Sequence, residues 1–311
     1  MADLRSQLRT GIIAGIKRGW RSFLWISRIV IPVSLLTTLL VWSGLLEHLS
    51  FLFSPMMNFI NLPFQAAIPI ISGMLTNLYV AIAAMTAMPF SVEQMTLIAV
   101  FTLICHNLIT EGIIQHKSGI NIVKITLIRI AAATLTVLAV SLFLGDTSEP
   151  VTAAAVPVAA EPLPTVMKEW AVDLLVLLAR ILGIITAVMV VLELSESLGW
   201  TERAVRFLRP LMKVLGLSEQ TATLWVTSGG FGLMYGGAIT IDKVRKGILR
   251  KDELERLHLS IGINHSMVED PALFLVAGVN PFWLWVPKLI TAIIAVHLYR
   301  AIRYLRDRLS H

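Results

Sequence analysis

Charged side chains are scarce in this 311-residue sequence, in which Asp, Glu, Lys and Arg together make up 15% of the positions. Soluble globular domains carry roughly 25%, and the hydrophobic share here is 56% with a mean hydropathy of +0.77. This composition excludes a disordered chain, a collagen-like fibre and an ordinary soluble domain. It indicates an all-α integral protein of the cytoplasmic membrane with several crossings, in contact with the lipid bilayer.

The sequence also lacks residues on which other protein classes depend. Its single cysteine, Cys105, has no partner for an internal disulfide. There is no Gly-Lys-Ser or Gly-Lys-Thr phosphate-binding loop, and no nucleophile–base pair or metal motif at a recognised spacing. We therefore predict a protein that is not an enzyme and needs no cofactor. The net charge of +6 predicts membrane topology rather than nucleic-acid binding.

Six stretches are apolar and long enough to cross the hydrocarbon layer. They are residues 29–46, 95–114, 130–144, 174–192, 257–279 and 282–298. Two further stretches, 66–88 and 222–241, are apolar but interrupted. The first contains Pro69, Gly73 and Asn77, and the second has five glycines within ten residues, which disfavours a regular helix.

The positions of basic residues favour re-entrant hairpins for the two interrupted stretches. If both crossed fully, the basic run 203–213 would face outward and the acidic linker 146–161 would face inward, against the positive-inside rule. If both enter and return on one side, only Lys168, Arg180 and Lys288 of the 26 Lys and Arg residues lie toward the outer half. This topology places both termini in the cytoplasm. Hairpins at membrane depth must line a protein-covered or watery site.

The first residues mix basic side chains (Arg5, Arg9, Lys17 and Arg18) with leucines and isoleucines. This pattern is typical of an amphipathic helix on the membrane surface rather than of a secretory signal. The predicted organisation has four parts: a cytoplasmic surface helix over 1–21, a first repeat over 22–145, an extracytoplasmic Ala- and Pro-rich linker over 146–166, and a second repeat over 167–311.

The repeats appear when the chain is compared with itself at an offset of 155 residues. The identical pairs are Gly44/Gly199, Glu47/Glu202, Pro55/Pro210, Met57/Met212, Leu62/Leu217, Gln65/Gln220 and Ala67/Ala222. With a few inserted residues the register continues to His106 and His265. Three crossings per half turn the second copy upside down. We therefore predict two inverted repeats, each with an interfacial helix, a re-entrant helical hairpin and three crossings, and a site near the midplane between them.

The second half resembles a known family. From Leu198 it reads Leu-Gly-Trp-Thr-Glu-Arg-Ala-Val-Arg-Phe-Leu-Arg-Pro-Leu-Met, followed by a glycine-rich segment and, from Arg250, by Arg-Lys-Asp-Glu-Leu. This pattern resembles the Gate, or nucleoside recognition, domain of spore maturation proteins A and B, of the membrane half of the bacterial ferrous-iron transporter and, more distantly, of concentrative nucleoside transporters. Gate-type transporters often associate, so the resemblance is compatible with a homo-oligomer.

The resemblance implies which residues form the hairpin tips and contact a substrate. In the first half these are Ser72, Gly73, Thr76 and Asn77; in the second they are Ser228, Gly229, Gly230, Tyr235 and Gly236. The second tip reads Gly-Gly-Phe-Gly-Leu-Met-Tyr-Gly-Gly, without the polar Gln-Thr/Ser-Glu tip by which the nucleoside transporters hold their ligand.

Ionisable residues inside the apolar stretches are candidates for function because they are expensive to place in a membrane. The candidates are His106, Asn107 and Glu111 in the first half, and Asn264, His265, Ser266, Glu269 and Asp270 in the second. His265 and Glu269 share a face of a regular helix. We expect a break at Gly112 to bring Glu111 to His106, and a second break at Pro271. His106, Glu111, His265 and Glu269 would then converge and suit a divalent metal or a proton.

Three functions remain open on this evidence. The first is a secondary transporter or permease of a small solute or ion, with its site between the two hairpins. The second is a divalent-metal, iron-like permease, with His106, Glu111, His265 and Glu269 as ligands. The third is a non-transporting assembly or scaffold protein of the spore-maturation type. The polar residues would then pair with Arg129, Arg180 or Lys288 only to hold helices together.

Overall fold

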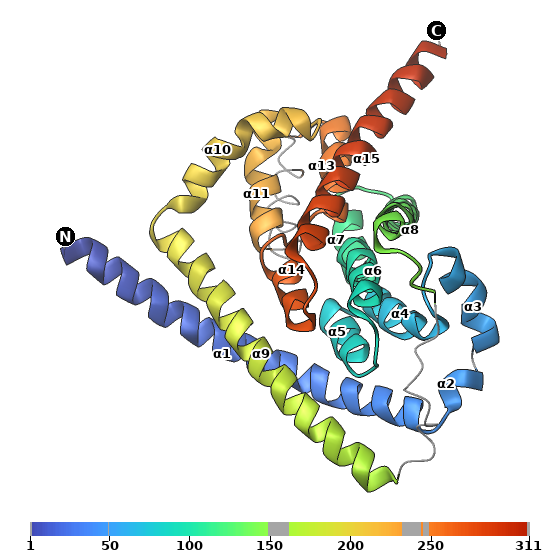
Figure 1. Cartoon of the computed structure of the whole chain (residues 1–311). Helices are drawn as coiled ribbons and strands as arrows, with labels where there is room; N and C mark the ends of the chain where they lie inside the picture. The colour runs from blue at the N-terminus through green and yellow to red at the C-terminus, as the bar shows by residue number, and fades with distance from the viewer. Residues whose placement is uncertain (1, 49, 149–161, 232–243, 245–248, 310–311) are drawn as a thin grey trace.

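The computed structural model describes residues 2–48, 50–148, 162–231, 244 and 249–309, and the described chain is helical (Figure 1). The first half contains α1 (Ala2–Trp42), α2 (Leu45–His48), α3 (Ser50–Phe59), η1 (Phe64–Ala66), α4 (Ala67–Leu75), α5 (Leu78–Thr86), α6 (Val92–Ile104), α7 (Leu108–Lys117) and α8 (Ile122–Leu144). The second half contains α9 (Leu163–Ser197), α10 (Trp200–Val214), η3 (Glu219–Thr221), α11 (Ala222–Phe231), α13 (Lys251–Ile263), α14 (Glu269–Phe274), η4 (Leu275–Ala277) and α15 (Pro281–Leu309).

Helix α1 continues without a break through residue 21, so the expected separate surface helix over 1–21 is wrong as a structural unit. The reason is its packing against α9. A Cβ added at Gly11, Gly15 or Gly19 would lie 2.9 Å or less from an atom of α9, because the two backbones approach closely at three successive turns. An ion pair of 2.9 Å between Arg18 and Glu193 joins the same two helices.

Residues 66–88 form the helical hairpin that the sequence predicts. Asn77 lies between α4 and α5, and its side chain accepts a hydrogen bond from the Val80 N–H, which caps α5. The two helices pack against one another, since a Cβ on Gly73 would lie 2.8 Å from the Cβ of Ala81. The pair α3–α4 bends by 92° at its junction, so α3 leaves the direction of the hairpin.

Five helical segments of the described residues are long and apolar enough to cross a membrane. They are Arg5–Trp42, Val92–Lys117, Ile122–Leu144, Leu163–Ser197 and Pro281–Leu309; the bent pair Phe51–Phe59 and Phe64–Leu75 would be a sixth. The stretch 257–279, in which the sequence predicts a break, is divided into α13, α14 and η4. Of the stretch 222–241, α11 is described and residues 232–241 lie outside the described part.

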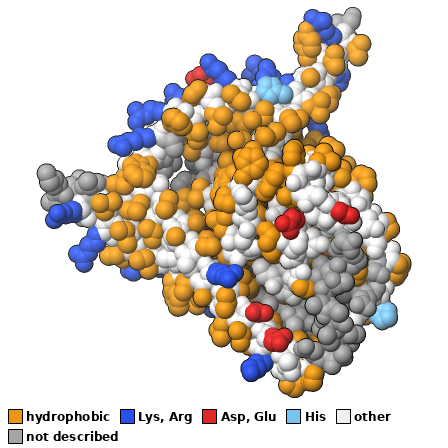
Figure 2. Space-filling view, viewed as in Figure 1, with side chains coloured by type: hydrophobic (Ala, Val, Ile, Leu, Met, Phe, Trp, Pro, Cys, Tyr) orange, Lys and Arg blue, Asp and Glu red, His pale blue; other side chains and the backbone are white. Residues whose placement is uncertain are grey.

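Helix α6 lies at the centre of the molecule, among α4, α5, α8 and α15 (Figure 1). It begins with a capping box between Ser91 and Gln94, and its side chains from Thr96 to Ile104 are buried on every face. The outer surface is mostly apolar. Lys and Arg side chains gather along α10 and at the C-terminal end of α15 (Figure 2). The exposed basic residues there are Arg203, Arg206, Arg209, Lys213, Arg300, Arg306 and Arg308.

Candidate functional site

Two helix breaks bring polar side chains into the core. One separates α6 from α7, and the other separates α13 from α14. In each break the residue after a histidine adopts the left-handed conformation: Asn107 follows His106 with φ 50°, and Ser266 follows His265 with φ 47°. A non-glycine residue rarely adopts this conformation, because its Cβ crowds the following carbonyl. Strained backbone of this kind is concentrated at functional sites.

The hairpin helices hold both breaks through the main chain. The Asn107 N–H donates to the Gly73 carbonyl of α4 over 2.9 Å, and the Ser266 N–H donates to the Ser228 carbonyl of α11 over 3.2 Å. These bonds satisfy amide groups that the interrupted helices leave without a partner. The first break is therefore coupled to α4, and the second is coupled to α11.

The two histidines meet edge to edge at the point where the breaks face each other. The Nε2 atoms of His106 and His265 lie 3.3 Å apart. Glu111 Oε1 lies 3.0 Å from the His265 Nε2 and 3.5 Å from the His106 Nε2. Asp270 Oδ2 lies 3.5 Å from the His106 Nε2. Four acceptor groups from the two breaks thus converge within a few ångströms, and the two rings and Glu111 are buried.

The opposite edge of each ring faces the backbone. The Nδ1 of His106 lies 2.8 Å from the Thr102 carbonyl, and the Nδ1 of His265 lies 2.9 Å from the Ile261 carbonyl. A carbonyl oxygen only accepts, so each Nδ1 must carry a hydrogen and donate it. This assignment leaves the Nε2 of a neutral ring with a free lone pair directed at the cluster.

Two buried cations flank the cluster. Arg129 donates from Nε to the Ile104 carbonyl (3.0 Å), from Nη2 to the His106 carbonyl (2.9 Å) and from Nη1 to Glu111 Oε2 (2.8 Å). Lys288 donates from Nζ to the His265 carbonyl over 2.9 Å. Each cation binds the carbonyl of a cluster histidine. The two cations are as far apart in the sequence as the two histidines are, at 159 residues.

The expected convergence of His106, Glu111, His265 and Glu269 needs one correction, since Asp270 takes the place of Glu269. The left-handed Ser266 interrupts the helix between His265 and α14, so His265 and Glu269 do not share a helix face. Glu269 Oε1 instead accepts a hydrogen bond of 2.8 Å from the Tyr79 hydroxyl.

The expected positions of both breaks are also wrong. Gly112 lies inside α7, packed against Ile122, and the first break occurs at Cys105–Asn107. Pro271 lies in the first turn of α14, where a proline displaces no helical hydrogen bond. The second break therefore precedes it.

The residues expected at the hairpin tips lie in several different settings. Ser72 donates to the Pro69 carbonyl, and Asn77 caps α5, so both serve the hairpin itself. Ser228 is fully buried, as is Asn264 at the end of α13, and their side-chain polar atoms have no hydrogen-bond partner in the part of the chain that the structure describes. Gly229 and Gly230 belong to α11, and the Gly229 carbonyl accepts from the Met267 N–H. Tyr235 and Gly236 lie outside the described residues.

Sequence reasoning missed three polar residues near the cluster. Tyr79 contacts Glu269, as described above. Gln115 and His258 are fully buried and carry polar atoms without a partner. Gln115 lies one helical turn beyond Glu111 on α7, and His258 lies two turns before His265 on α13. These i, i+4 and i, i+7 spacings from the named candidates were the available signal.

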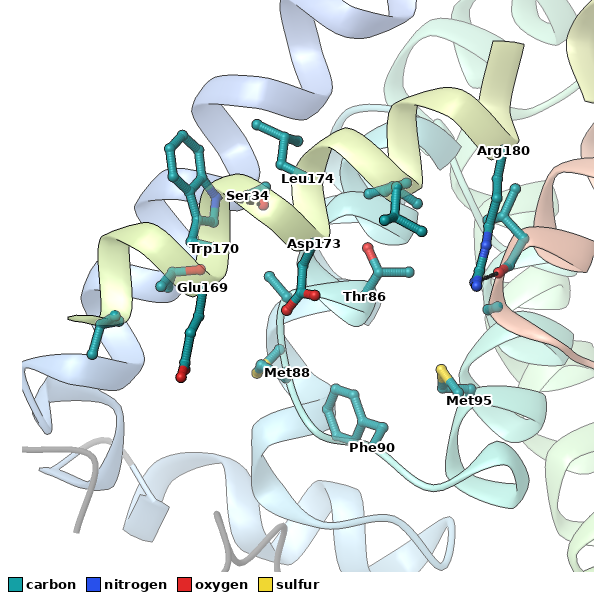
Figure 3. A pocket seen from close by; sticks show the side chains of 17 residues that line it. Ser34, Thr86, Met88, Phe90, Met95, Glu169, Trp170, Asp173, Leu174 and Arg180 are labelled. Carbon is teal, nitrogen blue, oxygen red and sulfur yellow. Dashed lines mark hydrogen bonds between the residues drawn. The ribbon is translucent and has the colours of Figure 1, made fainter. Parts of the chain in front are cut away.

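A cavity of about 450 Å³ lies at the far end of α5 from Tyr79 (Figure 3). Its polar lining comes mainly from α9. Glu169 and Asp173 lie toward one end, and Arg180 lies at the other, where it donates to the Val276 carbonyl over 3.1 Å. The cavity is separate from the histidine cluster, which lies at the opposite end of α5.

Comparisons with known proteins found one matching family and one similar protein. The family described as Gate, nucleoside recognition, matches residues 23–147 and 178–278. The uncharacterized membrane protein YvoD of Bacillus subtilis (strain 168) is 28% identical over 285 residues, which are 91% of each chain. No solved structure matches.

Proposed function

The chain belongs to the Gate, nucleoside recognition, family, and we propose that this multi-pass protein of the cytoplasmic membrane is a permease for a divalent transition-metal cation. The proposed site is the cluster of His106, His265, Glu111 and Asp270. Family membership and the apolar helices support the coarser description of a transporter-like membrane protein. The choice of a divalent cation as the transported substrate rests on the cluster itself.

The observation that carries the proposal is that four acceptor atoms, two imidazole nitrogens and two carboxylate oxygens, face one another with no donor between them among the described residues. With Nδ1 protonated on both rings, both Nε2 atoms present lone pairs to each other at 3.3 Å. The nearest polar atoms from other residues, Glu111 Oε1 and Asp270 Oδ2, belong to carboxyl groups, which accept only when ionised. Such an arrangement repels itself in a buried site unless a cation lies between the groups.

A transition metal fits the donor types and the spacing. Two imidazoles with carboxylates are ligands for zinc, iron and manganese. In a tetrahedral site with bonds of about 2.0–2.1 Å, adjacent donor atoms lie about 3.3 Å apart. The four contacts of the cluster range from 3.0 to 3.5 Å. Ligand atoms of His106, His265 and Asp270 all lie within 4.8 Å of one another. The Nδ1-to-carbonyl bonds resemble those that orient histidine ligands in metal sites.

The charges around the cluster suit a cargo rather than a permanent metal. Arg129 and Lys288 balance the two carboxylates, so a bound divalent ion would bring uncompensated positive charge into the core. A permeating ion must leave the site as well as bind there. A proton is the second candidate, because a single proton on the His265 Nε2 would supply the missing donor to Glu111 at 3.0 Å.

The two halves of the site support the proposal of inverted repeats. His106 and His265 lie 159 residues apart, and the same offset relates Arg129 to Lys288 and Glu111 to Asp270. We propose that the cluster lies near the midplane, where inverted-repeat transporters bind their substrates. The basic residues of α10 and of the end of α15 favour a cytoplasmic location for that face, with the linker 146–166 outside.

The test is metal binding to the detergent-purified protein. We expect Co²⁺ to give the absorption spectrum of a tetrahedral nitrogen and oxygen site, and Zn²⁺ to displace it. His106→Gln and His265→Gln should each weaken Zn²⁺ binding by at least about 10- to 100-fold, which is the loss caused by removing a residue that only orients a metal ligand. His116→Gln is the matched control, because His116 is an exposed histidine on α7 that does not contact the cluster.

Three other outcomes are informative. Failure of every metal to bind, together with pH-dependent thermal stability that both cluster-histidine variants alter, would favour the proton over the metal. Equal loss of metal binding in His116→Gln would place the metal on surface histidines and overturn the site. A thermal shift with nucleosides that the cluster variants abolish would replace the cation with an organic substrate.

A further inference from the structure

A line of buried polar groups leads from the cluster along the contact between α7 and α13. Glu111 and Gln115 are one turn apart on α7, and His258 and Gly262 are one turn apart on α13, which ends just before His265. These positions share one face of each helix. Glu111 contacts His265, and Gln115 Nε2 lies 3.4 Å from the His258 carbonyl. The two faces therefore oppose each other.

The register of these contacts indicates that the His258 side chain faces α7. From Glu111 through Gln115 to Gly119, just past the end of α7, the neighbours in the second half run from His265, just past the end of α13, through Gly262 to Leu254. His258 lies on the same helical face, between Gly262 and Leu254. We name the surface formed by Glu111, Gln115, Gly262, His258 and His265 the α7–α13 seam.

Glycine at position 262 makes room for this seam. A Cβ there would lie 3.0 Å from Gln115 Nε2 and 3.6 Å from the Cδ of Arg129. With glycine, the amide of Gln115 can lie directly against the α13 backbone.

Polar atoms in the seam have no partner. Both ring nitrogens of His258 and the Oε1 of Gln115 are buried and have no hydrogen bond among the described residues, and both side chains have no exposed surface. Such atoms are uncommon in folded proteins because leaving them unpaired is unfavourable, and their presence calls for an explanation. Here a histidine and a glutamine, which offer nitrogen and oxygen lone pairs, follow directly on a proposed cation site.

The far end of the seam approaches a surface cleft. A cleft of about 50 Å³ is lined by Asn121, Lys124 and Glu255, and Glu255 lies one turn from His258 on α13. Lys124 and Glu255 lie 3.9 Å apart. The cleft is lined by Glu255 and Leu259, which flank His258 in the α13 sequence, so the seam ends beside an opening that carries a carboxylate.

We infer that the α7–α13 seam is the path by which a hydrated cation passes between the central cluster and the Asn121–Glu255 cleft, with His258 and Gln115 as a transient second binding site. The inference rests on the proposed function for the identity of the cation. Whether water enters the seam does not depend on which cation passes through it. Water or the passing ion would supply the partners that the buried atoms lack.

Accessibility of the seam can be tested without knowing the cation. Cys105 is the single cysteine, so a Cys105→Ala background is free of thiols. In that background, His258→Cys should react with a small, charged, membrane-impermeant methanethiosulfonate reagent. Leu257→Cys should not react, because Leu257 is equally buried on the neighbouring apolar face of α13. Equal protection of the two cysteines would overturn the inference.

Flux and binding measurements separate this inference from the proposed function. With Zn²⁺ and protein reconstituted in vesicles, His258→Leu and Gln115→Leu should lower the initial uptake rate about tenfold, since each removes a polar contact along the path. The Kd of Zn²⁺ at the cluster should change less than twofold. Leu257→Met is the control for disturbance of α13.

The failures are distinguishable. If the wild-type protein does not bind Zn²⁺ at all, the proposed metal cargo fails, and the cysteine reactivity still decides whether the seam is wet. If the wild-type protein binds and transports Zn²⁺ but His258→Leu and Gln115→Leu transport it at the wild-type rate, the cation takes another path and the inference is wrong.

Discussion

The two helix breaks share a geometry but differ in how firmly they are held. At the first break, one arginine makes three hydrogen bonds, to the Ile104 and His106 carbonyls and to Glu111. At the second, Lys288 makes one, to the His265 carbonyl. A guanidinium presents several donors in a fixed plane, whereas an ammonium is a point charge on a flexible stem. The first break is therefore the fixed side of the site, and the second is the side better able to rearrange.

The acidic residues of the first break are also held more firmly than those of the second. Glu111 is bound by Arg129 in a buried ion pair of 2.8 Å. In the second half the carboxylates are adjacent: Asp270 faces His106, while Glu269 is bonded to Tyr79 of the opposite hairpin. The second break thus has no counterpart of the Arg129–Glu111 ion pair among the described residues, and its carboxylates contact the first half of the chain instead. A site built in this way can be anchored on one side and opened on the other.

The largest effect should come from Arg129→Leu. The substitution removes three donors and leaves the buried Glu111 carboxylate without its counter-charge, which costs about 3–5 kcal/mol of unfolding free energy. Chemical denaturation in detergent measures it. Arg129→Lys should recover only part of the loss, because one ammonium cannot reproduce the three bonds. If Arg129→Leu cost no more than removing Lys288, the two sides would be equivalent and the comparison would fail.

Lys288→Met should have a smaller effect. It removes one hydrogen bond and one buried charge near Asp270, and we expect a loss of about 1–3 kcal/mol in the same assay. The methionine fills a similar volume, which limits any contribution from a cavity. A loss as large as that of Arg129→Leu would show that the second break is held as firmly as the first.

A matched pair of glycines sharpens the comparison between the hairpin helices. Gly73→Ala should cost about 1–3 kcal/mol, because its Cβ would lie 2.8 Å from the Cβ of Ala81. Gly229→Ala should be neutral or stabilising by up to about 1 kcal/mol, since the nearest atom is 4.0 Å away and alanine favours a helix. Thermal unfolding of the two variants decides it. Equal costs would mean that α11 is packed as tightly as α4.

The smallest loss should come from Tyr79→Phe, which removes the hydroxyl that donates to Glu269. Hydrogen bonds between membrane helices contribute about 0.6 kcal/mol on average. A double-mutant cycle with Glu269→Gln isolates this contact, and we expect a coupling of that size. A coupling of zero would show that the contact between the first hairpin and the second break contributes nothing to stability.

The sequence predicted much of the fold because the relevant signals are local. Proline, glycine and asparagine within 66–88 predicted a hairpin, and Asn77 caps its second helix. The polar residues within apolar stretches pointed to the site itself, while the breaks beside them were expected at Gly112 and Pro271 and occur earlier. His106, His265 and Glu111 were named for their chemistry alone, and the structure brings them together.

What the sequence could not provide were features set by tertiary contacts. The breaks depend on Asn107 and Ser266 in left-handed conformations, which the Gly73 and Ser228 carbonyls stabilise from other helices. Neither residue type demands this conformation, whereas Gly112 and Pro271 carry stronger local signals and lie inside helices. Asp270 rather than Glu269 contacts the cluster because the second break occurs before Pro271 rather than at it. The continuity of α1 depends on its packing against α9.

That packing also makes one mechanical unit of two helices. A 41-residue helix is about 60 Å long, roughly twice the thickness of the hydrocarbon layer, so much of the α1–α9 pair must extend past the lipid tails or run obliquely through them. Because Gly11, Gly15 and Gly19 seat the two backbones directly on each other, neither helix can slide along the other without steric overlap. A tilt of α9 must therefore carry α1 with it, and the pair acts as a single strut beside the core.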